Sequence, residues 1–374
     1  MNKKTWAFVL SLIAFCSFVL CQQRPRVREF GIKPGILKPG ALNAITDVKG
    51  VKVGHVTLIK GKNIRTGVTA VLPHGGNIYL EKVPAAIYVA NGYGKLTGFT
   101  QVRELGNIET PIILTNTLSV PQAANAVISY VLSLPGCERV GSVNPVVGET
   151  NDGWLNDIRG RHIHQEHVLE AIKKASIGSV QEGSVGAGTG TICFGFKGGI
   201  GTSSRKLPPS RGGYTIGVLV QTNHGGVLSI NGYPAGITLK KHPMREETEG
   251  SCLMVVATDA PLDSRNLKRL AKRALLGIPR TGGYYSNGSG DYAISFSTAE
   301  NLRIDHRSDN PLRKAEVLRN DRMSALFLAA AEAGEEAILN SLFKAQSMTG
   351  KEGHRIEALP LDHIKNLIKE RNRK

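Results

Sequence analysis

Residues 245–258 read REETEGSCLMVVAT, a charged segment that passes through Gly250 and Ser251 into an unbroken apolar run. An apolar run of this length, without polar residues at alternate positions, predicts a strand that is buried on both faces. The charged residues before it predict a loop. The sequence therefore places a serine hydroxyl at the beginning of a central strand.

Gly250 suits cleavage of the main chain at this point, because it adds no side-chain bulk beside its carbonyl and permits strained backbone angles. Attack of the Ser251 hydroxyl on the Gly250 carbonyl would give an ester by an N-to-O acyl shift. Hydrolysis of that ester would leave Ser251 with a free hydroxyl and a free α-amine. With an ordinary pKa of about 8, this amine can act as the base for its own hydroxyl. A plain loop end is the alternative that the dipeptide alone leaves open.

The rest of the chain mixes strand-like and helix-like segments without strict alternation. Helical spacing is clearest after Asp263, where apolar residues share one face until Gly277 and Pro279 end the pattern. An alanine-rich helix is expected from about residue 312 or 323 to 343. Residues 45–58 predict a strand, a turn at Gly50 and a second strand. Further strand-like runs cover 85–90, 111–115, 191–196, 214–221, 252–258 and 292–297. Helices packed outside sheets, in a layered α/β or α+β sandwich, fit this pattern.

The composition indicates a folded globular chain, since 41% of its 374 residues are hydrophobic. The net charge of +17 comes from lysines and arginines spread along the chain, without a basic motif interleaved with aromatic residues. We therefore expect solvated helix faces and no nucleic-acid partner. Beyond residue 21 the cysteines are Cys137, Cys193 and Cys252, an odd number without metal-ligand spacing. Buried thiols are expected, and no disulfide framework.

The first 21 residues are typical of a secretory signal peptide. Lys3 and Lys4 precede the apolar run 6–19, which is too short to span a bilayer comfortably, and polar residues follow from Gln22. Leu20 is a poor residue before a lipid-anchored Cys21, so we expect release without a lipid anchor. The mature chain is thus expected in the periplasm or outside the cell, with no membrane span.

Two other segments carry candidate chemical groups for a site at Ser251. Ser289 and Asp291 lie in the glycine-loosened turn NGSGD, and in a strand they would point to the same side. Asn223 ends an apolar run before His224, and its amide could donate to an oxyanion. A turn-capping role for Asn223 is equally open on local grounds.

A histidine-rich segment offers a candidate metal site, but the spacing of its histidines does not favour one. Histidines three apart share a helix face, but the spacing of four residues found in zinc proteases is missing. We expect a solvated helix start and no metal. The segment GAGTG at 186–190 does not complete a dinucleotide fingerprint, since Thr191 stands where the third glycine would fall. Close backbone packing beside the site is expected there, and no cofactor. The histidine-rich segment contributes His162, His164, Glu166, His167 and Glu170.

Together these segments resemble the S58 peptidases, the family of the L-aminopeptidase/D-amino-acid esterase and the bacterial β-peptidyl aminopeptidases. The resemblance runs through nearly all of the chain beyond the signal peptide. The motifs that carry it are, in order, GALNAITDVKGVKVGHVTL, RTGVTAVLP, NGYGKLTG, TNTLSV, PVVGETNDGWLND, GSVGAGTG, VLVQTNHGG, GSCLMVVATDAPL, SNGSGDYAISFST and EAILNSLFKAQSMTG.

The resemblance implies roles for the candidate residues. Ser251 would be the nucleophile freed by cleavage after Gly250, and Ser289 with Asp291 would orient and activate it. Asn223 would help to form the oxyanion hole. Family members active on β-peptides often carry glutamate where this chain has Asp291, which bears on substrate preference.

Two residues near position 150 complete the implied site. Glu149 matches the position that receives the free amine of the substrate, and a buried carboxylate is a suitable partner for an ammonium group. Asn151 stands where some members carry a tyrosine, in the expected substrate pocket. The substrates implied are peptides, or aminoacyl amides and esters.

The implied fold is the four-layer α/β/β/α sandwich shared with ornithine acetyltransferases. One domain from residue 22 to 374 would be cut into fragments 22–250 and 251–374, which stay together and form oligomers, commonly tetramers of the processed unit. Two rival readings remain. One is acyl transfer of the ornithine acetyltransferase type, which normally uses threonine as nucleophile. The other is a secreted binding protein that kept the fold and lost activity.

Overall fold

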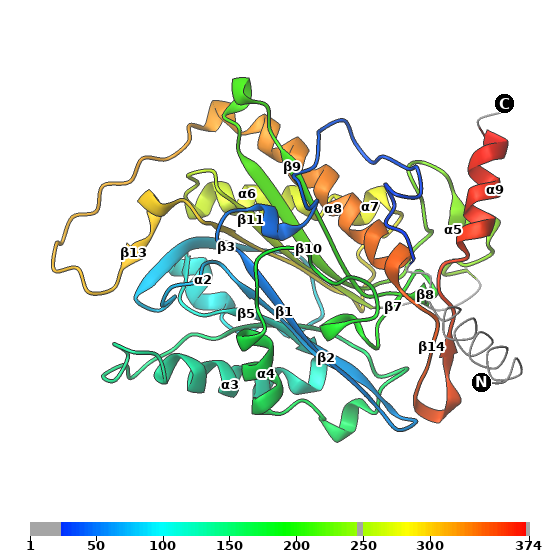
Figure 1. Cartoon of the computed structure of the whole chain (residues 1–374), viewed down its shortest axis with the longest axis horizontal. Coiled ribbons are helices and arrows are strands. Elements are labelled where there is room, and N and C mark those ends of the chain that lie inside the picture. Colours follow the sequence, from blue (N-terminus) through cyan, green and yellow to red (C-terminus); the bar gives the residue numbers. More distant parts are fainter. Residues whose placement is uncertain (1–23, 245–249, 372–374) are drawn as a thin grey trace, which may run out of the picture.

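The computed structural model describes residues 24–244 and 250–371, with side chains up to residue 366. The expected signal peptide and residues 245–249 of the loop before Ser251 lie outside the described residues. The chain forms four layers, in which two sheets lie face to face and helices cover their outer faces (Figure 1). This is the α/β/β/α sandwich that the sequence predicted.

The smaller sheet has four strands in the order β1-β2-β5-β6. The first three are antiparallel to their neighbours, while β6 runs parallel to β5. Helices α3 and α4 cover its outer face through an apolar layer that includes Val68, Ile113 and Val147. The bounds are β1 (Lys52–Lys60), β2 (Ile64–Leu72), β5 (Ile112–Asn116), β6 (Val146–Thr150), α3 (Val120–Leu132) and α4 (Gln165–Lys173).

The larger sheet has the order β13-β3-β12-β11-β10-β9, with β4 paired to β3. Strand β11 lies antiparallel to β10 and parallel to β12. Helices α6, α7 and α8 cover the outer face of the larger sheet. The bounds are β3 (Glu81–Gly92), β4 (Asn107–Ile108), β9 (Ile200–Lys206), β10 (Thr215–Asn223), β11 (Ser251–Thr258), β12 (Gly290–Ser297), β13 (Ile304–Asp305), α6 (Ser264–Ala274), α7 (Gly277–Arg280) and α8 (Ser324–Lys344).

Smaller elements connect the layers, and none of the described helices is long and apolar enough to cross a membrane. They are α2 (Phe99–Leu105), α5 (Ala235–Thr238), α9 (Leu361–Arg371), β7 (Ile192–Cys193), β8 (Phe196–Lys197), β14 (Met348–Thr349) and β15 (Arg355–Ile356).

The unbroken apolar run of β11 reflects burial on both faces of the larger sheet. Leu253 and Val255 point into the core between the sheets, whereas Cys252, Met254 and Val256 pack under the helices. Every residue of the strand is buried. The prediction of a central strand at 252–258 is therefore confirmed.

Most predicted elements are present, and two predictions were wrong. The helix after Asp263 is α6, capped by the Asp263 carboxylate, and the alanine-rich helix is α8, which begins at Ser324 rather than near 312. Residues 45–47 form a 3-10 helix instead of a strand. The run 191–196 is no single strand, because Phe194 (φ 52°) and Gly195 (φ 74°) turn the chain between β7 and β8.

A buried ion-pair network joins the chain before Gly250 to the chain after it. Arg205 of β9 reaches Glu332 at 3.0 Å and Glu336 at 2.8 Å, both on α8. Arg28 also pairs with Glu336 at 2.8 Å. Because the two glutamates belong to residues 251–374, the network links the two expected fragments beside Ile216, at the end of β10 opposite Asn223.

We expect Glu336→Ala to lower the free energy of unfolding by about 3 kcal/mol, because it removes the carboxylate that pairs with Arg28 and leaves the buried Arg205 with Glu332 as its remaining counter-charge. Chemical denaturation monitored by circular dichroism measures this change. Glu300→Ala is the control, since its pair with Lys49 is exposed and should contribute less than about 1 kcal/mol. If Glu336→Ala and Glu300→Ala lowered the free energy of unfolding equally, the buried network would contribute no more to stability than an exposed ion pair.

Candidate active site

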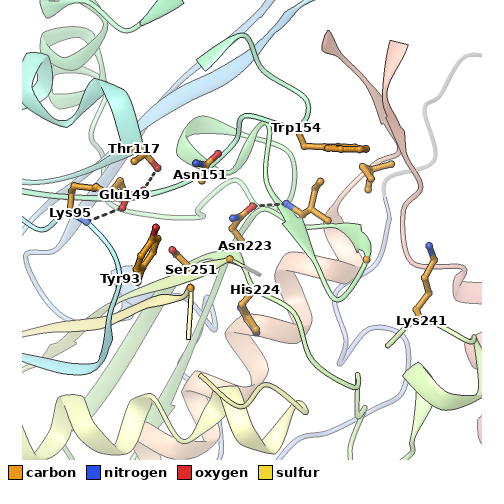
Figure 2. Close-up of a pocket in the computed structure, with 15 residues that line it drawn as sticks. Tyr93, Lys95, Thr117, Glu149, Asn151, Trp154, Asn223, His224, Lys241 and Ser251 are labelled. Carbon is orange, nitrogen blue, oxygen red and sulfur yellow. Dashed lines mark hydrogen bonds between the residues drawn. The ribbon is translucent and has the colours of Figure 1, made fainter. Parts of the chain in front are cut away.

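Three strand ends of the larger sheet meet at Ser251. Asn223, the last residue of β10, is the register partner of Ser251, the first residue of β11. On the other side, Asp291 near the start of β12 lies opposite Cys252. The sheet thus brings together residues that are far apart in the sequence, and Figure 2 shows the side chains of Ser251 and Asn223 next to each other.

The Ser251 hydroxyl is held in place at the wall of a cavity of about 590 Å³. Only 5% of the residue is exposed, and its Oγ accepts a hydrogen bond from the Gly290 main-chain N–H at 3.1 Å. This bond occupies one lone pair of Oγ and leaves its proton for another acceptor. A hydroxyl that is buried, oriented and open to a cavity has the geometry of a nucleophile.

Glycine is required at position 250 because there is no room for a side chain, and not because the backbone is strained. Its φ does not lie in the left-handed region, contrary to the expectation of strained angles. A Cβ at this position would collide with the main-chain oxygen of Asn223 and would lie 3.2 Å from the Asn223 Nδ2 atom. The main chain before Ser251 therefore passes directly over the asparagine.

The Asn223 carboxamide has a fixed orientation. Its Oδ1 accepts a hydrogen bond from the Ile192 main-chain N–H at 2.9 Å, so the Nδ2 group must face the other way, toward Gly250. Asn223 is 6% exposed and lines the cavity. An amide donor beside Gly250 is a candidate to stabilise negative charge on the Gly250 carbonyl oxygen.

Asp291 and Ser289 form a buried polar pair behind the strand ends. Ser289 precedes β12 by one residue, so it lies in the turn and not in the strand. Both Asp291 carboxylate oxygens and the Ser289 hydroxyl are buried without a well-formed hydrogen bond to any described residue. Burial raises the pKa of Asp291 to about 6, and the nearby Ser289 hydroxyl and Cys252 main chain limit the rise.

Glu149 presents a second carboxylate to the same cavity, from the end of β6 in the smaller sheet. It is 2% exposed, its Oε1 accepts from the Lys95 main-chain N–H at 2.9 Å, and its Oε2 accepts from the Thr117 hydroxyl. Burial raises the pKa of Glu149, while these two hydrogen bonds and the Lys95 charge oppose the rise. No local sequence pattern indicates Lys95 or Thr117 as its partners.

The rim of the cavity contains residues that sequence reasoning missed. The Trp154 ring stacks on His354 with centroids 4.0 Å apart, and Tyr93 lies near Lys95. Asn151 also lines the cavity, where its Oδ1 accepts from the Gly153 N–H at 2.9 Å. Trp154 and His354 are 200 residues apart, so no local pattern could have joined them.

The histidines considered for a metal do not converge. His162 bonds to Asp157 at 3.0 Å, and His164 and His167 lie at the start of α4. Among residues 24–244 and 250–371, no group of three or more side chains is placed to hold a metal ion.

His224 and Cys193 lie next to the site but are poor nucleophilic partners. Their side chains approach to 3.8 Å, and both are buried. Burial lowers the pKa of His224 to about 4 and raises that of Cys193 to about 12, so both groups are neutral near pH 7. The prediction of buried thiols is confirmed for Cys193 and Cys252, and Cys137 is buried as well.

The fold and the site define the class of protein. A serine hydroxyl at the first residue of a central strand, a glycine before it, and an amide donor over the connecting bond are the arrangement of an N-terminal-nucleophile hydrolase. The chain belongs to peptidase family S58, whose model matches residues 43–356. It is an enzyme of that aminopeptidase family.

Named relatives support this placement over nearly the whole length. The chain is 42% identical to beta-peptidyl aminopeptidase BapA of Sphingosinicella microcystinivorans, covering 93% of each chain. The solved structure of the PH0078 protein from Pyrococcus horikoshii OT3 is 50% identical and superposes with a TM-score of 0.86, over 93% of this chain and 99% of that one. The L-aminopeptidase D-Ala-esterase/amidase of Ochrobactrum anthropi, described as a variant of the Ntn hydrolase fold, is 36% identical with a TM-score of 0.87, over 94% and 99%.

The raised pKa of Asp291 predicts a pH-dependent stability. A carboxyl group with a folded-state pKa of about 6, against an ordinary 3.8, binds its proton more tightly in the folded chain. It therefore favours folding below pH 4, and this contribution is lost as the pH rises through 6. Asp291→Asn, made in a chain kept intact by Ser251→Ala, should gain up to about 3 kcal/mol relative to its parent between pH 4 and pH 7. Urea denaturation across this range measures the gain, with the exposed Asp309→Asn as control. A difference that does not change with pH would contradict the assignment.

Proposed function

We propose that the chain is an autoprocessing serine aminopeptidase, which releases N-terminal amino acids from peptides, amides or esters through an acyl-enzyme on Ser251. One observation carries the proposal. The Ser251 hydroxyl and the Asn223 amide flank the bond between Gly250 and Ser251, at a cavity that also holds the buried Glu149 carboxylate. The aminopeptidase names of the relatives favour hydrolysis over acyl transfer.

The first reaction cuts the chain. Ser251 Oγ attacks the Gly250 carbonyl carbon while its proton passes to Asp291, directly or through Ser289. Asn223 Nδ2 donates to the oxygen that becomes negatively charged. The C–N bond then breaks, its nitrogen takes up the proton, and an ester remains between residue 250 and the serine oxygen. Water hydrolyses this ester to give the Gly250 carboxylate and to regenerate the Ser251 hydroxyl beside its free amine.

The second reaction repeats the chemistry on a substrate. The freed Ser251 amine accepts the proton of its own hydroxyl, and Oγ attacks the substrate carbonyl. The tetrahedral oxyanion again receives the Asn223 amide, and the proton passes to the leaving amine or alcohol. Water then attacks the acyl-enzyme and releases the amino acid. The unpaired oxygens of Asp291 and Ser289 support a role in holding the new ammonium group beside the nucleophile.

Glu149 is proposed to bind the free amine of the substrate. Its carboxylate is already fixed by Lys95 and Thr117, so it can meet an ammonium group without losing side-chain freedom. A buried ion pair of this kind selects substrates with a free N-terminus, because an acylated amine would leave the carboxylate unpaired. The substrate side chain would then lie among Asn151, Tyr93 and Trp154.

Export and assembly are also proposals. The charged and apolar pattern of residues 1–21 supports a signal peptide and a periplasmic or secreted enzyme. After cleavage, fragments 22–250 and 251–374 would stay together through the β10–β11 pairing and the Arg205 network. The family resemblance supports further association into tetramers of processed units, which light scattering of the purified protein would measure.

The purified protein should consist of two fragments, one ending at Gly250 and one beginning at Ser251. Ser251→Ala should leave a single inactive chain, because it removes the attacking hydroxyl. Intact mass and N-terminal sequencing measure the cut, and aminoacyl p-nitroanilides measure activity. Ser308→Ala, at an exposed serine, should be cut and active. Retained activity in Ser251→Ala would place the nucleophile elsewhere, and an uncut but active wild-type chain would refute autoprocessing.

Glu149→Gln should be cut normally and should lose about 10- to 100-fold in kcat/KM on substrates with a free amine, since a charged hydrogen bond contributes about 1.5–3 kcal/mol. The loss should appear mainly in KM, because the ammonium is bound in both ground and transition states. The exposed Glu104→Gln is the matched control. If Glu149→Gln kept wild-type kinetics, the amine would be bound by another group.

A further inference from the structure

Lys197 is a fully buried lysine that the proposed reaction does not use. It lies in β8, in the short hairpin beside the cavity, and its ammonium group donates all three protons to main-chain oxygens. The acceptors are Gly198 at 2.8 Å, Thr191 at 2.9 Å and Gly188 at 3.0 Å. Burying an ammonium group is costly, so its position next to the active site calls for a physical account.

One of these bonds leads directly to the oxyanion donor. The Thr191 oxygen and the Ile192 nitrogen belong to the same peptide group. Lys197 binds the oxygen end of this group, and the N–H at the other end donates to Asn223 Oδ1 at 2.9 Å. A continuous chain of hydrogen bonds therefore runs from the ammonium through one peptide unit to the carboxamide, whose Nδ2 faces Gly250.

Each link in this chain strengthens the next. A positive charge at the Thr191 oxygen draws electron density from the peptide, which makes the Ile192 N–H a better donor. A stronger bond to Asn223 Oδ1 has the same effect on the carboxamide, so its Nδ2–H becomes a better donor too. The low dielectric of the interior favours this effect, because no water competes for the ammonium.

We propose that Lys197 is a positioning residue, which fixes and polarises the Asn223 amide through the peptide between Thr191 and Ile192. The inference rests on the proposed function, in which Asn223 stabilises the oxyanion. It assigns Lys197 to both reactions, since the cut at Gly250 and the hydrolysis of substrate use the same donor. Lys197 touches neither substrate nor the reacting atoms.

The three main-chain acceptors around the Lys197 nitrogen fit an ammonium group, which has three protons to donate. Burial lowers the pKa of its ammonium to about 7, and the attraction of the nearby Asp152 carboxylate opposes this fall. Asp152 is itself fully buried, with one carboxylate oxygen bonded to Asn156 and the other unpaired among the described residues. Burial also raises the pKa of Asp152 to about 7, so the charge of Lys197 rests on its three main-chain acceptors and not on an ion pair with Asp152.

A double-mutant cycle with Lys197→Met and Asn223→Ala tests the inference. Lys197→Met keeps the aliphatic stem and removes the charge. We expect Asn223→Ala to lower kcat by about 100-fold, as for loss of one oxyanion donor. Lys197→Met should lower kcat by about 10-fold with little change in KM, because the effect arises in the transition state. In the Asn223→Ala background, the same change should lower kcat less than about twofold.

The controls separate a positioning role from a structural one. Arg205→Met also removes a buried cation, but far from the site, and its effect on kcat should multiply with that of Asn223→Ala. Lys197→Gln keeps a neutral donor and should retain more activity than Lys197→Met. It also replaces that variant in the cycle should Lys197→Met fail to fold. Thermal denaturation of every variant records the structural loss.

Two outcomes would overturn the inference. The first is a double variant in which the fold-losses of kcat multiply, whether Asn223→Ala is combined with Lys197→Met or with Lys197→Gln. Lys197 would then act independently of the amide. A loss confined to KM would exclude action in the transition state. Failure of the underlying proposal looks different, because Ser251→Ala would then remain active, or Asn223→Ala would cleave itself and turn over substrate at the wild-type rate.

Discussion

The pairing of Asn223 with Ser251, at the last residue of β10 and the first of β11, is the constraint on which the site depends. Antiparallel pairing sets the two main chains side by side, so the residue before Ser251 must pass over the asparagine. The space left there admits no Cβ, and the occupant is therefore glycine. The same pairing places the side-chain amide of Asn223 beside that glycine. Sheet geometry thus supplies nucleophile, donor and target together, and β12 adds the carboxylate of Asp291 from the other side.

Placing a reactive bond at the start of a central strand has a structural benefit. The two faces of β11 are buried in different cores, with Leu253 on the sheet side and Met254 on the helix side. A cut at Gly250 would free one end of this strand without removing any of these contacts. Arg205 and Glu336, on opposite sides of the cut, add an electrostatic connection that does not involve β11. The proposed cut would therefore leave the packing of β11 intact on both faces.

The sequence predicts a structural feature correctly where the residues that determine it all lie in one short segment. The apolar run after Ser251 predicted the central strand, and Asp263 predicted the start of α6, because burial and capping act over a few residues. The family resemblance predicts that Asn223, Glu149 and Asp291 belong to one site, which no single segment could indicate. Local reasoning failed at residues 191–197, where strands of two residues are too short to show a period and Phe194 takes a left-handed turn. It also could not find contacts between distant segments, such as Trp154 on His354.

In the proposed mechanism, the uncut chain carries its first substrate within the site. Gly250 lines the cavity together with Asn223 and Ser251, so the acyl group of residue 250 occupies the place that a substrate acyl group would take later. Hydrolysis of the ester would release that segment from the cavity and restore the hydroxyl of the nucleophile, whose amine the acyl shift has already freed. Because the oxyanion donor must serve an internal bond first and an external one afterwards, its orientation has to be independent of the segment that leaves. The bond from Ile192 to Asn223 meets this requirement, since it comes from the β7–β8 hairpin and not from the loop before Ser251. Anchoring that hairpin with Lys197 then keeps the donor aligned in both reactions.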